Sequence, residues 1–324
     1  MAVRSEAREI MSLHEEKPPL PGEPAPEGEN PNLPELTEMP SAEPSPNWSG
    51  AGTDPSAATE VVPYPPAKTY PEDLQISWSW PHLILFVVFG FGSLTVIQGV
   101  LAVIYMPPQK LTAKQLEAYL ISKPQFAIGS LLIWYATIFF FLYVTLSVLR
   151  GHPFWHTLGW RKLVPANPRI PRNPFAYFFA GAGLSLFVAL MTSSMKTPDN
   201  TPIEELFKYP HTAMMFVAMA VFVAPLVEET LFRGYLYPMF ARSFGVTPAI
   251  LLTGVLFGLM HGAQLGWTWG LVAMLTLVGI VFTLVRARTG TVFASFMMHL
   301  GYNLLISLAT GLSTHWFTKM PTGK

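Results

Sequence analysis

Residues 224–234 read APLVEETLFRG, and they lie inside an apolar stretch that runs from about 212 to 240. A helix needs about 20 mainly apolar residues to cross a bilayer, so this stretch is long enough. Two carboxylates and a guanidinium are expensive at that depth, and ionisable groups there are candidates for a functional site. The stretch therefore predicts a membrane-spanning helix that carries chemistry, and its Pro225 predicts a kink or a split.

Further apolar stretches surround this one on both sides. They cover residues of about 80–106, 126–149, 175–195, 249–263, 267–285 and 292–312. We predict an all-α fold, a polytopic transmembrane helix bundle of about seven to eight spans. Seven spans follow from the count, and a split of the 212–240 stretch would give eight.

The composition agrees with a membrane protein and excludes several classes of function. Charged residues make up 12% of the chain, against roughly 25% in a soluble domain. The formal net charge is zero, so there is no basic surplus for binding nucleic acid. The chain has no cysteine, which excludes disulfides, thiolate metal sites and thiol nucleophiles. The expected partners are the lipid bilayer and a peptide or protein substrate.

The first 75 residues differ from the remainder. They are rich in Pro, Glu and Ser, and such a sequence buries too little apolar surface to offset its ordering entropy. We predict a disordered N-terminal arm over 1–75, N-terminal transmembrane spans over 76–200 and a catalytic membrane domain over 201–315. The charged residues 1–17 lack the apolar region of a signal peptide.

The loops give a modest orientation signal. Arginines concentrate between the second and third spans, after the fourth span and between the sixth and seventh, all on the side of the N-terminal arm. The positive-inside rule therefore places the N-terminus in the cytoplasm. The predicted location is an integral protein of the membrane, specifically a bacterial cytoplasmic membrane.

Glu228 and Glu229, the two glutamates of the 224–234 stretch, should have different surroundings. Adjacent helical residues point about 100° apart, and residues four apart share a face. Glu229 can thus pair with Arg233, which leaves Glu228 free to act as a general base. The alternative is a helix end at the interface, with both carboxylates reaching water.

Three more polar residues lie in later spans. His261 ends the sequence FGLMH, and His299 and Asn303 lie four apart on one helical face. An imidazole and an amide at that spacing suit an oxyanion hole, or one metal ligand with its neighbour. The alternatives are a packed, hydrogen-bonded histidine at 261 and an interhelical hydrogen-bond pair at 299 and 303. Four ionisable groups on three spans favour one common site.

At these residues the chain resembles the CPBP family, the CaaX-protease and bacteriocin-processing (Abi) intramembrane proteases, and within it the type II CaaX prenyl endopeptidases. The family pattern is EExxxR, then FxxxH, then HxxxN or HxxxD. The corresponding residues here are Glu228, Glu229 and Arg233, then Phe257 and His261, then His299 and Asn303. Pro225 and residues 289–291 extend the match. The resemblance covers about 210–312, under half of the chain.

The resemblance implies an intramembrane endopeptidase in which Glu228, helped by His261, activates water. His299 and Asn303 would then stabilise the oxyanion of the tetrahedral intermediate. Glu229 and Arg233 would hold the helix and Glu228 in place.

The resemblance leaves the metal question open. The family is often described as metalloproteases, and Glu228, His261 and His299 could supply a zinc-binding set. Water activation by Glu228 without metal explains the same residues. We lean toward the metal-free alternative, with zinc as the possible cofactor and no other cofactor expected.

The expected substrate is a membrane-associated protein or peptide, with or without a prenyl group, cleaved near its C-terminus. One rival function is a non-catalytic membrane scaffold or bacteriocin self-immunity protein that retains the motif residues. A second is an ion-coupled transporter, in which buried Glu and His act as proton relays. Inverted internal repeats would favour a transporter, and the sequence shows no convincing repeat.

Overall fold

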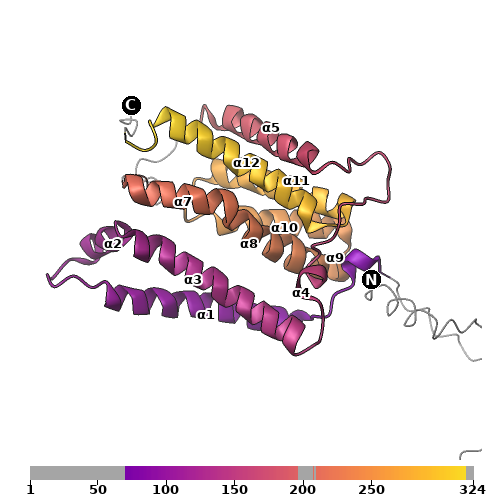
Figure 1. Ribbon diagram of the computed structural model, residues 1–324, viewed down its shortest axis with the longest axis horizontal. Helices are drawn as coiled ribbons and strands as arrows, with labels where there is room; N and C mark the ends of the chain where they lie inside the picture. The colour runs from indigo at the N-terminus through magenta and orange to yellow at the C-terminus, as the bar shows by residue number, and fades with distance from the viewer. Residues whose placement is uncertain (1–69, 196–206, 208, 319–324) are drawn as a thin grey trace, which may run out of the picture. The chain divides into compact units, whose positions relative to one another are not determined.

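The computed structural model describes residues 70–195, 207 and 209–318, and every regular element in them is a helix. Figure 1 shows their arrangement. The elements are η1 (Glu72–Leu74), α1 (Trp80–Ile104), α2 (Ala113–Ile121), α3 (Pro124–Leu142), η2 (Tyr143–Val148), α4 (Phe154–Thr157), α5 (Pro174–Thr192), α7 (Pro210–Phe222), α8 (Ala224–Glu229), η3 (Thr230–Leu236), α9 (Tyr237–Phe244), α10 (Val246–Met260), α11 (Trp269–Thr289) and α12 (Val292–Ser313). The predicted all-α transmembrane bundle is confirmed.

Within the described residues, six helices are long and apolar enough to cross a membrane. They are Trp80–Ile104, Pro124–Val148, Pro174–Thr192, Pro210–Phe244, Trp269–Thr289 and Val292–Ser313. The fifth predicted span, 249–263, is instead the 15-residue helix α10. At 1.5 Å per residue α10 is about 22 Å long, shorter than the ~30 Å hydrocarbon core. It ends at Met260, because the chain turns at residues 261–267.

The span that carries the glutamates is interrupted, as Pro225 predicts. Helix α7 ends at Phe222, and α8 begins at Ala224 with Pro225 near its start. A proline has no backbone N–H, so it cannot continue the hydrogen-bond ladder of the preceding turn. The following segment, Thr230–Leu236, is π-helical, and π-helical turns are frequent at functional sites. This break leaves polar groups available in the middle of the bundle.

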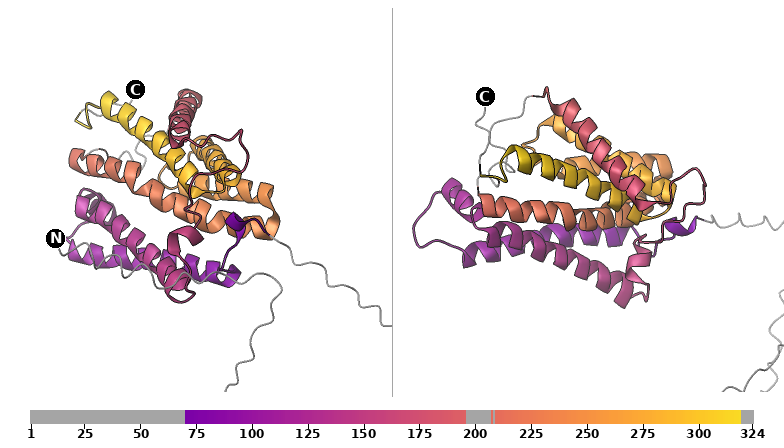
Figure 2. Two further views of the ribbon diagram at one scale, coloured as in Figure 1. Left: turned by 45° about the vertical axis from the view of Figure 1, so that its right-hand side comes forward. Right: turned by 45° about the horizontal axis from the view of Figure 1, so that its top comes forward.

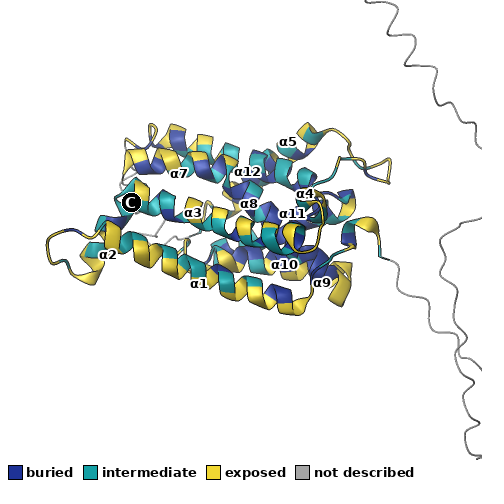
Figure 3. Ribbon diagram, turned by 60° about the horizontal axis from the view of Figure 1, so that its bottom comes forward, coloured by how far each residue is buried: buried dark blue, intermediate teal, exposed yellow. Residues whose placement is uncertain are grey.

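Burial separates the outer helices from the central ones. In an apolar stretch of 18 residues of α1 only 17% is buried, against 44% for the corresponding stretch of the Pro210–Phe244 span. Figure 3 shows exposed residues along the outer face of α1 and buried residues around α8, α9 and α11. The large apolar side chains that α1 exposes are Trp, Ile, Leu, Val and Phe, which suits contact with lipid.

Helix α12 lies between α5 and the α7–α8 segment (Figures 1 and 2) and packs most closely against α5. A Cβ atom added at Gly181 would collide with the carbonyl of Met298, and one at Gly301 would collide with that of Phe178. Small residues at a crossing let two backbones approach. These glycines therefore fix α12, and with it His299, against α5.

Residues 70–75 differ from the prediction of a disordered arm that ends near 75. They include the short helix η1, and Arg286 donates to both the side chain and the backbone carbonyl of Asp73 at 2.9 Å. Arg161 pairs with Glu72. Arginines contributed by distant segments thus order this end of the arm. Residues 1–69 lie outside the described residues, and the domain boundaries stay predictions.

Candidate functional site

Glu229 and Arg233 form the predicted i,i+4 pair. The NH1 atom of Arg233 lies 2.9 Å from Oε1 of Glu229, and both side chains are fully buried. Full burial of Glu229 contradicts, for this carboxylate, the alternative in which both glutamates reach into interfacial water. A buried pair of this kind requires good geometry and further hydrogen bonds to offset its desolvation.

Arg233 receives those further contacts from α11. Its Nε donates to Oγ1 of Thr283 at 3.2 Å, and NH2 donates to the carbonyl of Gly279 at 2.7 Å. The guanidinium carbon lies 4.6 Å from the centroid of the Phe257 ring, a cation–π distance. Arg233 therefore joins the π-helical segment η3 to α10 and α11, and it holds Glu229 at a fixed position.

His299 completes this buried network from α12. Its Nδ1 lies 3.0 Å from the same Oε1 atom of Glu229. The sequence before α12 sets the position of the helix: Gly290 ends α11 at φ +71°, and the Thr291 side chain caps α12 by accepting from the N–H of Phe293. His299 follows seven residues after the start of α12, about 10 Å along the helix axis. The imidazole is thus well inside the bundle.

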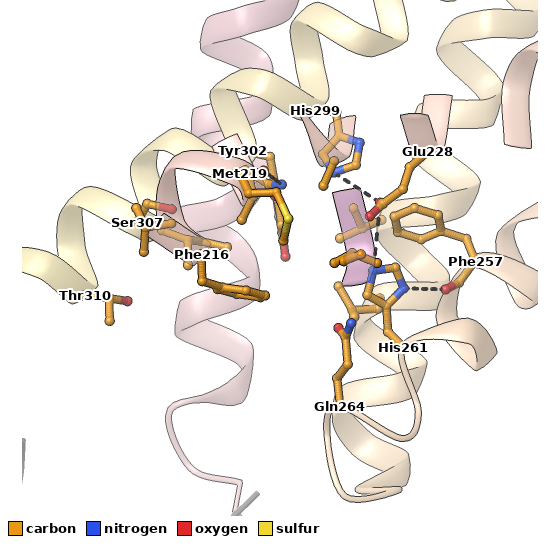
Figure 4. A pocket seen from close by; sticks show the side chains of 18 of the residues that line it. Phe216, Met219, Glu228, Phe257, His261, Gln264, His299, Tyr302, Ser307 and Thr310 are labelled. Carbon is orange, nitrogen blue, oxygen red and sulfur yellow. Dashed lines mark hydrogen bonds and ion pairs between the residues drawn. The ribbon is translucent and has the colours of Figure 1, made fainter. Parts of the chain in front are cut away.

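Glu228 lines a cavity, where it faces His261 and His299 (Figure 4). Its Oε2 lies 3.8 Å from Nε2 of His261 and 3.8 Å from Nε2 of His299. Its side chain is 18% exposed, whereas that of Glu229 is fully buried. The adjacent glutamates therefore have separate surroundings, as the 100° step predicts.

His261 lies at the C-cap of α10 rather than within a span. Its Nδ1 lies 2.7 Å from the carbonyl oxygen of Phe257, and the two rings are 4.7 Å apart between centroids. A carbonyl only accepts, so Nδ1 carries the proton and Nε2 faces Glu228 (Figure 4). The FxxxH spacing therefore has a local explanation, because the backbone of the first residue orients the ring of the last.

The hydrogen-bonding atoms around Glu228 are arranged unusually, because acceptors face one another. Glu229 is paired with a guanidinium, so its carboxylate accepts and Nδ1 of His299 donates. In their neutral forms both imidazoles then present the lone pair of Nε2 toward Oε2 of Glu228. Three acceptors converge without a donor between them. The place between them suits a water molecule or a proton.

Asn303 lines the same cavity, but part of its amide is already engaged. Nδ2 donates to the carbonyl oxygen of Ala220 at 2.8 Å. Ala220 lies just before the break at Val223 that separates α7 from α8. One N–H of the amide is thereby fixed, and the second stays available to a ligand in the cavity.

The cavity has a volume of about 250 Å³, which is enough for several water molecules. It extends along α12 from His299 to Thr310, about 16 Å of helix. Residues that the sequence did not point to also line it. They are, among others, Tyr135 of α3, Phe216 of α7, Gln264 and Ser307. The pairing of α3 with α7 brings Tyr135 there, and hydropathy carries no signal of such a contact.

The proposed zinc ligands are of suitable residue types, but their side chains are not placed as a zinc site requires. Glu228, His261 and His299 are ligand types that zinc accepts, and each imidazole has a partner on Nδ1 as zinc ligands usually do. However, within residues 70–195, 207 and 209–318 no group of three or more His, Asp or Glu side chains is arranged so that it could hold a metal ion. We therefore derive no step through a metal.

Comparison with known proteins confirms the family resemblance that the motifs predict. Residues 210–305 match the family model described as type II CAAX prenyl endopeptidase Rce1-like. The matched segment contains all of Glu228, Glu229, Arg233, His261, His299 and Asn303. No curated protein and no solved structure matches the chain.

Proposed function

We propose that this chain is an intramembrane endopeptidase that hydrolyses a peptide bond near the C-terminus of a membrane-associated protein or peptide. One observation carries the proposal: Oε2 of Glu228 faces the Nε2 atoms of His261 and His299 at 3.8 Å each, in a cavity enclosed by apolar helices. Ionisable groups inside a membrane-spanning bundle are energetically costly and generally mark a functional site. The family match over residues 210–305 supports the same activity.

In the proposed first step Glu228 is the general base. A water between Glu228 and the imidazoles loses one proton to the carboxylate as its oxygen attacks the peptide carbonyl carbon. The C–O bond forms, and the electron pair of the C=O bond moves to the carbonyl oxygen. His261 orients the water by accepting its second hydrogen at Nε2, since its Nδ1 is held by Phe257.

His299 and Asn303 would stabilise the oxyanion that results. Asn303 contributes its free amide N–H, while Nε2 of His299 donates only as an imidazolium, which would face Glu228 and Glu229 on its two ring nitrogens. The intermediate collapses by breaking the C–N bond, and the protonated Glu228 gives its proton to the leaving amine. The products are a new carboxyl terminus and a free amine, so atoms and charges balance.

Glu229 and Arg233 act in this scheme as positioning residues. Neither residue is part of the cavity lining, and together they connect η3, α11 and α12 through hydrogen bonds. The proposed metal-independent chemistry therefore relies on a rigid support behind Glu228 and His299.

We further propose that the N-terminus lies in the cytoplasm of a bacterial cell, on the side of the arginine-rich loops. Arg161, Arg242 and Arg286 all contact the segment just before α1, which supports one common end for these groups. Whether the enzyme recognises a prenyl group on the substrate is tested by comparing prenylated with unprenylated peptides.

The test is cleavage of quenched C-terminal peptides, prenylated and unprenylated, by purified protein beside Glu228→Gln. We expect cleavage by the wild type and none by the variant, with equal thermal unfolding midpoints. Cleavage of the prenylated peptides alone would place the lipid in the recognised substrate. A folded wild type that cleaves no peptide would favour the scaffold or self-immunity alternative.

A further inference from the structure

Helix α3 contributes a phenol to the cavity, although α3 lies outside the segment that matches the family. Leu131 and Tyr135 are four residues apart on one face of α3, and both line the cavity with Glu228. The Tyr135 side chain is half-buried. A tyrosine in this position presents a hydroxyl group to whatever occupies the cavity.

Among the described residues the hydroxyl of Tyr135 makes no hydrogen bond to another protein group, although tyrosine hydroxyls usually find a partner when they are buried. Tyr135 and Glu228 line the same cavity, Tyr135 from α3 and Glu228 from α8. Tyr135 thus adds a phenol to the cavity that holds the proposed general base.

The site also offers few hydrogen-bond donors for the oxyanion. Asn303 uses one N–H for Ala220, and neutral His299 has a lone pair rather than a proton on Nε2. An oxyanion hole works through donors aimed at the position where charge develops. A third donor from α3 would supply what the two residues on α12 provide only in part.

Building on the proposed function, we propose that the Tyr135 hydroxyl donates a hydrogen bond to the carbonyl oxygen of the scissile peptide, as a third member of the oxyanion hole. The phenol keeps its proton throughout, and it stabilises the charge on the oxygen while the C–O bond forms and the C–N bond breaks. Its role requires α3 to stay beside α7 during the reaction.

The test compares Tyr135→Phe with Tyr143→Phe in the full-length protein, beside wild type and Glu228→Gln. Tyr143 follows on the same span with its side chain half exposed, and its variant controls for loss of a phenol from this span. Removing one oxyanion donor costs about 10²–10³ in kcat in a well-studied protease. We expect a loss of about 100-fold in kcat for Tyr135→Phe, with unchanged KM and unfolding midpoint, and none for Tyr143→Phe.

The outcomes separate this inference from the proposed function. Cleavage lost in Glu228→Gln but retained within twofold in Tyr135→Phe overturns the role of Tyr135 alone. A folded wild type without activity overturns both. If Tyr135→Phe unfolds, fluorinated tyrosine at 135 replaces it as the probe: a changed kcat at constant KM supports the hydrogen bond, and an unchanged kcat overturns it.

Discussion

Nδ1 of His299 lies 3.0 Å from Oε1 of Glu229, the same oxygen that accepts a hydrogen bond from Arg233. One carboxylate oxygen therefore connects a guanidinium on η3 with an imidazole on α12. Nε2, on the other side of that imidazole, faces Glu228. In the proposed mechanism the buried Glu229–Arg233 pair therefore supports His299 and Glu228 and does not itself react.

This arrangement predicts opposite phenotypes for the two adjacent glutamates. Glu229→Gln leaves Arg233 as a buried cation without its anion, which costs about 3–5 kcal/mol. We expect a clearly lowered thermal unfolding midpoint in detergent and secondary loss of activity. Glu228→Gln, whose side chain borders the cavity, should keep the midpoint and lose cleavage by about 10²–10⁴-fold. Equal midpoints for both variants would contradict the supporting role of Glu229.

Asn303→Ala tests the contribution of the amide. Loss of a donor to the oxyanion should lower kcat by about 10²-fold, and loss of the bond to Ala220 should cost about 1 kcal/mol of stability. If Asn303 only binds the carbonyl of Ala220, Asn303→Ala would lower the unfolding midpoint and leave kcat unchanged. Measuring both in one preparation separates the two roles.

Chelation tests the metal-free chemistry. Because the described histidines and carboxylates form no group that could hold a metal ion, we expect full cleavage after dialysis against a chelator. We also expect less than one zinc per chain by elemental analysis. Activity that disappears on chelation and returns with zinc would show that Glu228, His261 and His299 close around an ion.

The sequence predicted the parts of the site that depend on local geometry. The Glu229–Arg233 pair follows from their i,i+4 spacing, and the break near Pro225 follows from a missing N–H. Hydropathy located the seven apolar helices. It did not show that α10 ends at Met260, because residues 261–263 continue the apolar pattern while the chain turns.

Other contacts join residues far apart in the chain, and no local pattern encodes them. Asn303 binds Ala220 only because α7 stops at Phe222, and Tyr135 reaches the cavity only because α3 packs beside α7. Asp73 and Arg286 are 213 residues apart. Such pairs depend on tertiary packing, which is why the ordered end of the arm was not predicted.

The same pair gives a prediction about the arm. Arg286 is fully buried and the Asp73 side chain is 21% exposed, whereas the Glu72 side chain that pairs with Arg161 is 70% exposed. Asp73→Asn should therefore lower the unfolding midpoint clearly. Glu72→Gln, the matched control, should change stability by about 0–1 kcal/mol, as surface pairs do. Similar effects of the two variants would mean that the buried guanidinium does not depend on Asp73.

The last prediction concerns the contact that places His299. Gly181 and Gly183 lie on the same helix α5, but a Cβ at Gly181 would collide with the Met298 carbonyl, and a Cβ at Gly183 meets nothing within 4 Å. Alanine normally stabilises a helix by up to about 1 kcal/mol over glycine. Gly183→Ala should thus be neutral or stabilising in thermal unfolding. Gly181→Ala should destabilise the bundle and reduce kcat, because separating α5 from α12 displaces His299 from Glu228. Equal stability of the two alanine variants would show that α12 can shift without cost and that this crossing does not position the site.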